Sequence, residues 1–198
     1  MTQSSHSGRA AEQNDDLERF YSANLARVID WVKFAETKNA GLLTFSSAWL
    51  IALATFLTSE KSRPLVAIYA AGAALPMFAL GAFFAFAAFM PKTKLEEFFR
   101  PSPATSGSIT NYTFWGHLAD LSPDAASAAI TTRYGVSKGQ KSSDTLLDDL
   151  ASQAVINAII AKRKFELFGY GATCVLVGFA IITVMAAVGF VWTWTNAS

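Results

Sequence analysis

The stretch NYTFWGHLADL, residues 111–121, gathers the side chains of this sequence that are best suited to bind a small ligand. Aromatic rings stack on nucleobases, and an asparagine or histidine beside them can hydrogen-bond a base edge or a phosphate. The candidates here are Asn111, Tyr112, Phe114, Trp115 and His117. A competing interpretation is that the aromatic residues and Leu118 form the core of a small helical domain, because aromatic side chains are most often core residues.

Further polar residues could complete such a site. Arg133 and the Lys-Arg-Lys trio at 162–164 carry the charge that a phosphate needs. The trio has a second explanation, because basic residues beside a membrane span commonly contact lipid headgroups. Gln153 and Asn157 lie four residues apart, on one face of a predicted helix. If buried, they need hydrogen-bond partners, and if exposed, they are ordinary surface residues.

Motifs that would indicate catalysis are missing from the sequence. It contains no Gly-rich phosphate loop, no paired-histidine helix motif, no CxxC and no GxSxG. The second histidine, His6, falls in a polar N-terminal tail, so His117 has no histidine partner for a metal ion. We therefore expect neither an enzyme nor a bound metal or cofactor.

The elements that must position these residues are set by three long uncharged apolar runs. Hydrophobic residues make up 52% of the chain and charged residues only 16%, against about 25% charged in soluble domains. A bilayer core of about 30 Å needs about 20 apolar residues in a helix. The runs predict transmembrane helices over residues 40–58, 65–90 and 168–193. Because no charge lies inside them, a proton relay or an ion-coupled transporter is disfavoured.

The remaining segments complete an all-α membrane protein. Residues 1–13 are predicted to be a disordered tail, and 14–39 an amphipathic helix that continues into the first span. Residues 91–165 are predicted to be a small helical domain with a helix capped at Ser122. A long helix starting at Ser143 should run without a break into the third span.

The distribution of basic residues predicts the orientation in the membrane. Lysines and arginines flank the N-terminal side of the first span and both ends of the 91–165 segment. By the positive-inside rule the N-terminus and residues 91–165 are cytoplasmic, and the C-terminus is on the opposite side of the membrane. Small residues in the second span favour either close packing within the chain or self-association into a homo-oligomer.

Three stretches, in order, resemble a known family. The segments 30–50, 114–122 and 148–171 are similar to sequence patterns of the Pycsar effector transmembrane proteins. The matching residues are Trp31, Phe34, Ala35, Glu36, Lys38, Gly41 and Leu42, then Phe114, Gly116, His117, Leu118 and Ala119, then Asp149, Leu150, Gln153 and Lys164. Asn39 departs from the pattern, which usually has alanine there, and Val155 lies one position later than the pattern places it.

The resemblance implies a function that composition alone does not. Members of that family are effectors in two-gene antiphage systems, where a uridylate or cytidylate cyclase makes cyclic UMP or cyclic CMP on infection. The effector senses the nucleotide and impairs the inner membrane, which causes abortive infection. The implied partners are thus the cyclic nucleotide, its cyclase and the lipid bilayer, without nucleic acid. The alternative is a small oligomeric membrane scaffold or adaptor that has no nucleotide ligand.

Overall fold

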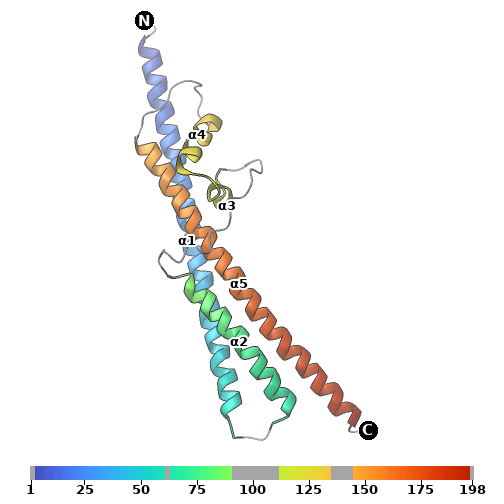
Figure 1. Ribbon diagram of the computed structural model, residues 1–198. Helices are drawn as coiled ribbons and strands as arrows, with labels where there is room; N and C mark the ends of the chain where they lie inside the picture. The colour runs from blue at the N-terminus through green and yellow to red at the C-terminus, as the bar shows by residue number, and fades with distance from the viewer. Residues whose placement is uncertain (1–2, 61–62, 91–111, 135–144, 197–198) are drawn as a thin grey trace. The chain divides into compact units, whose positions relative to one another are not determined.

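The computed structural model describes residues 3–60, 63–90, 112–134 and 145–196, which are almost entirely helical (Figure 1). The helices are α1 (Gln3–Thr58), α2 (Leu65–Ala87), α3 (Trp115–Leu118), α4 (Pro123–Tyr134) and α5 (Thr145–Asn196). Three of them, α1, α2 and α5, contain stretches long and apolar enough to cross a membrane. The prediction of an all-α protein with three potential spans is confirmed for the described ranges.

The chain forms two compact units. The first unit comprises Met1–Phe34 and Lys94–Arg163, and the second comprises Ala35–Thr93 and Lys164–Ser198. Both α1 and α5 therefore contribute one end to each unit, and each remains a single helix throughout. No stop signal interrupts α1 before the first span, and α5 runs without a break into the third span, as the sequence predicts.

The second unit is a bundle of the C-terminal parts of α1 and α5 with α2 (Figure 1). Its buried core consists of Leu42, Leu53, Ala71, Ala74, Phe78, Ala85 and Val175. Aromatic rings join the three helices at its centre. Trp49 stacks on Phe78 at 5.5 Å, and Phe179 meets both rings edge-on, at 5.0 and 5.2 Å between centroids. Such ring pairs add to the stabilisation that burial provides.

Glycines allow these helices to approach closely. A Cβ atom added at Gly81 of α2 would lie 2.7 Å from Cγ2 of Val175 and 3.2 Å from the carbonyl oxygen of Gly171, both on α5. A Cβ at Gly178 would lie 2.9 Å from the Phe78 ring. Close backbone approach replaces the hydrophobic effect as the driving force where helices meet in lipid. The small residues of the second span therefore serve packing within the chain at Gly81.

Polar contacts fasten one end of this bundle. Nζ of Lys164 on α5 donates to Oε1 of Glu36 on α1 and to the carbonyl oxygen of Ala88, the C-cap of α2, each at 3.0 Å. The side chain of Lys164 is only 13% exposed. Asn39, fully buried, donates from Nδ2 to the carbonyl oxygen of Lys164 at 3.0 Å. This group, which we call the lysine clasp, joins all three helices of the second unit.

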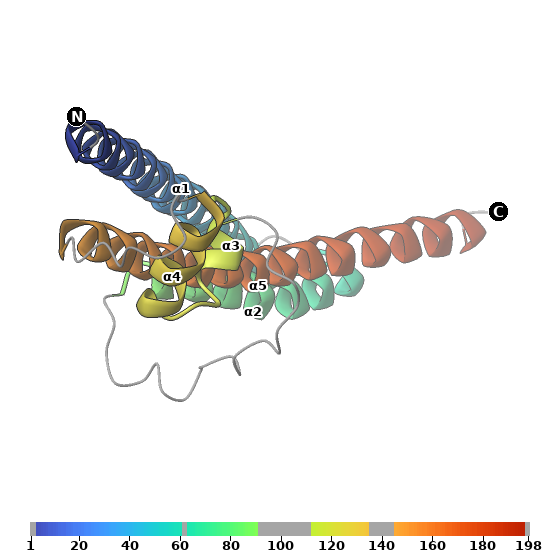
Figure 2. The ribbon, with the colours of Figure 1, turned by 90° about the horizontal axis from the view of Figure 1, so that it is seen from above.

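The first unit packs the N-terminal parts of α1 and α5 around α3 and α4, which lie beside these two helices in both views (Figure 1, Figure 2). One buried cluster contains Val28, Leu118, Ala126, Ala154, Val155 and Ala158. A second contains Leu17, Tyr21, Ile130, Leu147 and Ala151. Hydrogen bonds link the helices as well. Tyr21 donates to the carbonyl oxygen of Ser127 on α4 at 3.4 Å, and the Ser127 hydroxyl donates to Asp148 on α5 at 2.7 Å.

Several boundaries can be compared with the sequence predictions. The predicted helix cap is present, because the Ser122 hydroxyl accepts a hydrogen bond from the Ala125 amide at 3.2 Å, just before α4. Ser143, the other predicted cap, lies outside the described residues. The backbone from Gln3 to residue 13 is helical, although the sequence favours a disordered tail there. Good helix formers in this segment, such as Ala10, Ala11 and Gln13, account for the difference.

Candidate functional site

The aromatic stretch forms a small structured element on the first unit. Phe114 has an extended backbone and precedes the single turn of α3. Its ring lies 5.2 Å from the rings of both Trp115 and His117, edge-on to the histidine. Leu118 of the same turn is fully buried, whereas Phe114 is 41% exposed. The core interpretation thus applies to Leu118 and in part to Trp115, which is half-buried and packs against the same cluster, while Phe114 lies at the surface.

Gly116 leaves room for the Phe114 ring in this turn. A Cβ atom at position 116 would lie 2.6 Å from Cε1 of Phe114, so the phenyl ring covers the glycine. A side chain at residue 116 would displace the ring from this place beside His117. The spacing of phenylalanine, glycine and histidine therefore has a packing explanation that is independent of any ligand.

Tyr112 lies where three segments of the first unit meet. It packs against both buried clusters and is itself half-buried. Its carbonyl oxygen accepts a hydrogen bond from Nδ2 of Asn24 on α1 at 3.2 Å. The guanidinium carbon of Arg133 on α4 lies 5.7 Å from the centroid of its ring, within the range of a cation–π contact. An aromatic ring, an amide and a guanidinium are thus brought together.

Asn24 is a residue that the sequence analysis missed. It is 1% exposed, and its Oδ1 atom has no hydrogen-bond partner among the described residues. A buried acceptor without a partner costs about 1–3 kcal/mol. One sequence signal was available. Positions 17, 21, 24 and 28 lie on one helical face, and Asn24 is the polar residue in an otherwise apolar stripe.

The other predicted residues occupy different environments. Gln153 is exposed on α5, and Asn157 is half-buried with its Nδ2 donating to the Gln153 carbonyl oxygen at 2.8 Å. Asn157 thus makes a local bond within its own helix. Asn111 lies outside the described residues.

The basic residues 162–164 do not gather at one site. Within the first unit Lys162 pairs with Asp120 at 2.6 Å, and both side chains are 29% exposed. Lys164 belongs to the lysine clasp of the second unit. Lys162 and Lys164 therefore have carboxylate partners in the protein, which explains their presence without phosphate or headgroups.

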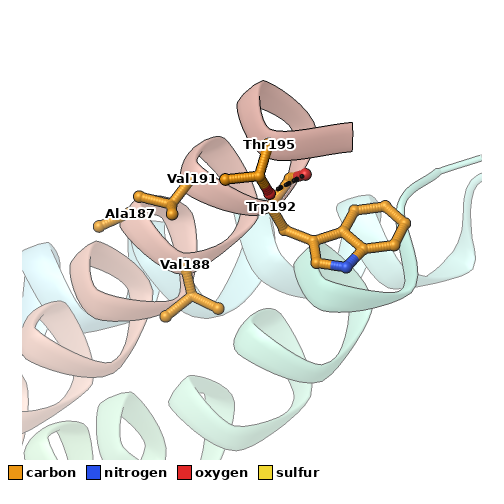
Figure 3. Close-up of a pocket in the computed structure, with 5 residues that line it drawn as sticks. All are labelled: Ala187, Val188, Val191, Trp192 and Thr195. Carbon is orange, nitrogen blue, oxygen red and sulfur yellow. Dashed lines mark hydrogen bonds between the residues drawn. The ribbon is translucent and has the colours of Figure 1, made fainter. Parts of the chain in front are cut away.

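In the described part of the chain, neither a group of metal ligands nor an enclosed pocket indicates a ligand site. There, no group of three or more histidine, cysteine, aspartate or glutamate residues could hold a metal ion. A hollow of about 420 Å³ at the end of α5 is lined by Ala187, Val188, Val191, Trp192 and Thr195 (Figure 3). All five come from one helix and are exposed, and the polar contact drawn is a Thr195 bond to the Trp192 carbonyl. This hollow is a surface depression of an apolar helix.

Comparison with known proteins decides the family. The family model described as the Pycsar effector protein domain matches residues 20–192. The chain belongs to the Pycsar effector family. It is similar to the Pycsar effector protein RsPycTM of a Rhizobium species, with 36% identity over 163 residues, which cover 82% of this chain and 90% of the relative. No solved structure matches the chain.

Membership of the Pycsar effector family identifies the chain as an effector of antiphage defence. The family implies a cyclic nucleotide signal from a cyclase and a membrane setting, and the three apolar helices fit a membrane protein. The match also spans both units, including the segment of Tyr112 to Leu118 and the lysine clasp.

Proposed function

We propose that this Pycsar effector senses cyclic UMP or cyclic CMP through its first unit and then impairs the integrity of the inner membrane. The observation that carries the proposal is the family match over residues 20–192, because it includes the first unit together with all three apolar helices. A membrane anchor alone would not need a second compact unit with its own core.

The proposed nucleotide site lies around Tyr112. The rings of Tyr112 and Trp115 are half-buried, which leaves part of each ring for stacking on a base. His117 can hydrogen-bond the ligand, and Arg133 supplies a cation near Tyr112 for the cyclic phosphate. The sensing region then includes α1 from Leu17 to Val28 as well as the predicted 91–165 segment.

The continuity of α1 and α5 supports the step from sensing to membrane damage. Each helix belongs to both units without an interruption of its backbone hydrogen bonds. A ligand can shift a conformational equilibrium only by its difference in affinity for the two states. We propose that a nucleotide-stabilised arrangement of the first unit is passed along these helices to the spans, which then cluster as a homo-oligomer and leak.

The binding part of the proposal is tested on purified full-length protein in lipid nanodiscs. Titration calorimetry with cyclic UMP, cyclic CMP, cyclic AMP and cyclic GMP should give saturable binding for a pyrimidine nucleotide. Trp115→Ala should weaken that binding about tenfold, since stacking on a base contributes about 1–3 kcal/mol. The absence of binding to any of the four nucleotides would refute the sensor function. Normal binding by Trp115→Ala would refute only the location of the site.

The membrane part is tested in cells that express the effector with an inducible pyrimidine nucleotide cyclase. Induction should depolarise the inner membrane, as reported by a potential-sensitive dye, and a catalytically dead cyclase serves as control. The scaffold alternative predicts unchanged membrane potential in both cultures. Growth arrest without depolarisation would contradict the proposed effect on the membrane.

A further inference from the structure

The side-chain amide of Asn24 is buried and only partly hydrogen-bonded within the described ranges. One hydrogen of Nδ2 is donated to the Tyr112 carbonyl oxygen at 3.2 Å. The other end, Oδ1, is buried and accepts no hydrogen bond from any residue in the described ranges. Buried polar atoms in folded proteins nearly always have partners, so each exception needs an explanation. In the described ranges Oδ1 of Asn39 and Oγ of Ser46 share this state, but both belong to the second unit. A ligand that donates a hydrogen bond here would provide one.

Asn24 lies between the two buried clusters of the first unit along α1. Tyr21, one turn earlier on α1, belongs to one buried cluster, and Val28, one turn later, belongs to the other. Tyr112 packs against both clusters, and Arg133 lies over its ring. The amide therefore lies at the junction of two apolar clusters, next to an aromatic ring that carries a cation on its face.

We propose that Asn24 reads the base of the activating nucleotide by accepting a hydrogen bond from its Watson–Crick edge, an inference that rests on the proposed cyclic-pyrimidine sensing. Oδ1 would accept from N3–H of uracil or from the N4 amino group of cytosine. The second hydrogen of Nδ2 would donate to the neighbouring acceptor, O4 of uracil or N3 of cytosine. The two bonds would form a bidentate pair comparable to the one by which asparagine reads adenine.

The neighbouring groups fit the rest of such a nucleotide. The Tyr112 ring provides a face for the base, and Arg133 a cation for the cyclic phosphate. Because Asn24 is 1% exposed, the base reaches it only when side chains around it move aside. Binding at Asn24 is thereby linked to a rearrangement within the first unit, which is what a sensor requires.

The test combines a change in the protein with a change in the ligand. The proteins are wild type, Asn24→Leu, and the control Ser22→Leu, which changes an exposed residue of the same turn of α1. The ligands are cyclic UMP against its N3-methyl derivative, and cyclic CMP against its N4,N4-dimethyl derivative. Methylation removes the proposed donor, and affinities are measured by calorimetry on full-length protein in nanodiscs. The ligand arm on wild-type protein does not depend on any variant folding.

We expect methylation of the preferred nucleotide to weaken wild-type binding at least about tenfold, because it leaves a buried acceptor unpaired. Asn24→Leu should weaken binding of the parent nucleotide similarly and should bind both forms about equally. Ser22→Leu should behave as wild type. Equal wild-type affinity for parent and methylated nucleotide overturns the inference, as does equal sensitivity to methylation in Asn24→Leu. If wild type binds neither parent nucleotide, the proposed function itself fails.

Discussion

At the scale of single residues, two polar side chains with little exposure link distant segments, one in each unit. Asn24 holds the Tyr112 carbonyl in the first unit, and Lys164 joins Glu36 to the C-cap of α2 in the second. Both make bonds between segments far apart in the sequence. Polar groups with little access to water are costly to leave without partners, so these contacts contribute to the specificity of each unit.

The lysine clasp gives a prediction about stability. Lys164→Met keeps most of the aliphatic side chain but removes the donor of the Ala88 carbonyl and of Glu36, whose side chain is 46% exposed and stays hydrated. We expect the free energy of unfolding to fall by about 1.5–3 kcal/mol. The measurement is an unfolding titration in mixed detergent micelles, followed by circular dichroism.

Lys33→Met is the matched control for the clasp. Its ion pair with Asp30 is exposed, with 69% and 76% of the two side chains accessible. Exposed pairs contribute little, so the free energy of unfolding should change by less than about 0.5 kcal/mol. Equal losses in the two variants would show that burial of Lys164 has no special importance.

At the scale of elements, one helix serves packing alone, whereas two helices also connect the units. Helix α2 is a packing element, whose buried face contains Ala70, Ala71, Ala74, Phe78, Gly81 and Ala85. Helices α1 and α5 are packing elements and also the continuous connections between the units. Local changes in these helices should therefore have separable effects on stability and on signalling.

On α2, the contribution of a glycine to stability depends on its position in the helix. Gly81→Ala would place a Cβ atom 2.7 Å from Val175 and 3.2 Å from the Gly171 backbone, so α2 must move away from α5. We expect a loss of about 1–3 kcal/mol in the free energy of unfolding. Gly72→Ala is the control, because nothing described lies within 4 Å of an added Cβ there. The same micelle titration compares them, and an unchanged Gly81→Ala would contradict the close approach.

For α5, breaking the helix should separate sensing from response. Glu166 is exposed and lies just after the boundary of the first unit. Glu166→Pro removes one backbone hydrogen bond and clashes with the preceding turn, at a cost of about 3 kcal/mol or more. We expect nucleotide affinity within about threefold of wild type, but loss of depolarisation in cells that express the cyclase.

Glu166→Ala is the control for that break, because alanine removes the charge and preserves the helix. It should bind nucleotide and depolarise cells as wild type does. Full depolarisation by Glu166→Pro, at equal protein level, would show that an unbroken α5 is not needed for the response.

At the scale of the whole molecule, the three potential spans of the described ranges predict termini on opposite sides of the membrane. Basic residues around the first span and the 91–165 segment favour a cytoplasmic N-terminus. Alkaline phosphatase fused after Ser198 should therefore be active, because that enzyme requires the periplasm to form its disulfides. The same reporter inserted after Ser106 should be inactive. The reverse pattern would contradict the predicted orientation.

The sequence by itself determined the features that local patterns encode. The length of uncharged apolar runs predicted three membrane-compatible helices, because the thickness of a bilayer sets the length that a span needs. The Ser122-Pro123 start of α4 and the uninterrupted α5 also followed from local chemistry. The motif around Phe114 and His117 indicated the family that the comparison then established.

The tertiary structure alone decided which polar residues meet. Asn24 and Tyr112 are 88 residues apart, and Glu36 and Lys164 are 128 apart, so no local periodicity could pair them. For the same reason the sequence offered Lys164 as a phosphate or headgroup contact, although it closes the clasp. It also could not tell buried Gly81 from open Gly72 on one helix. Pairing and burial depend on which faces of distant helices come together, and only the folded chain fixes that.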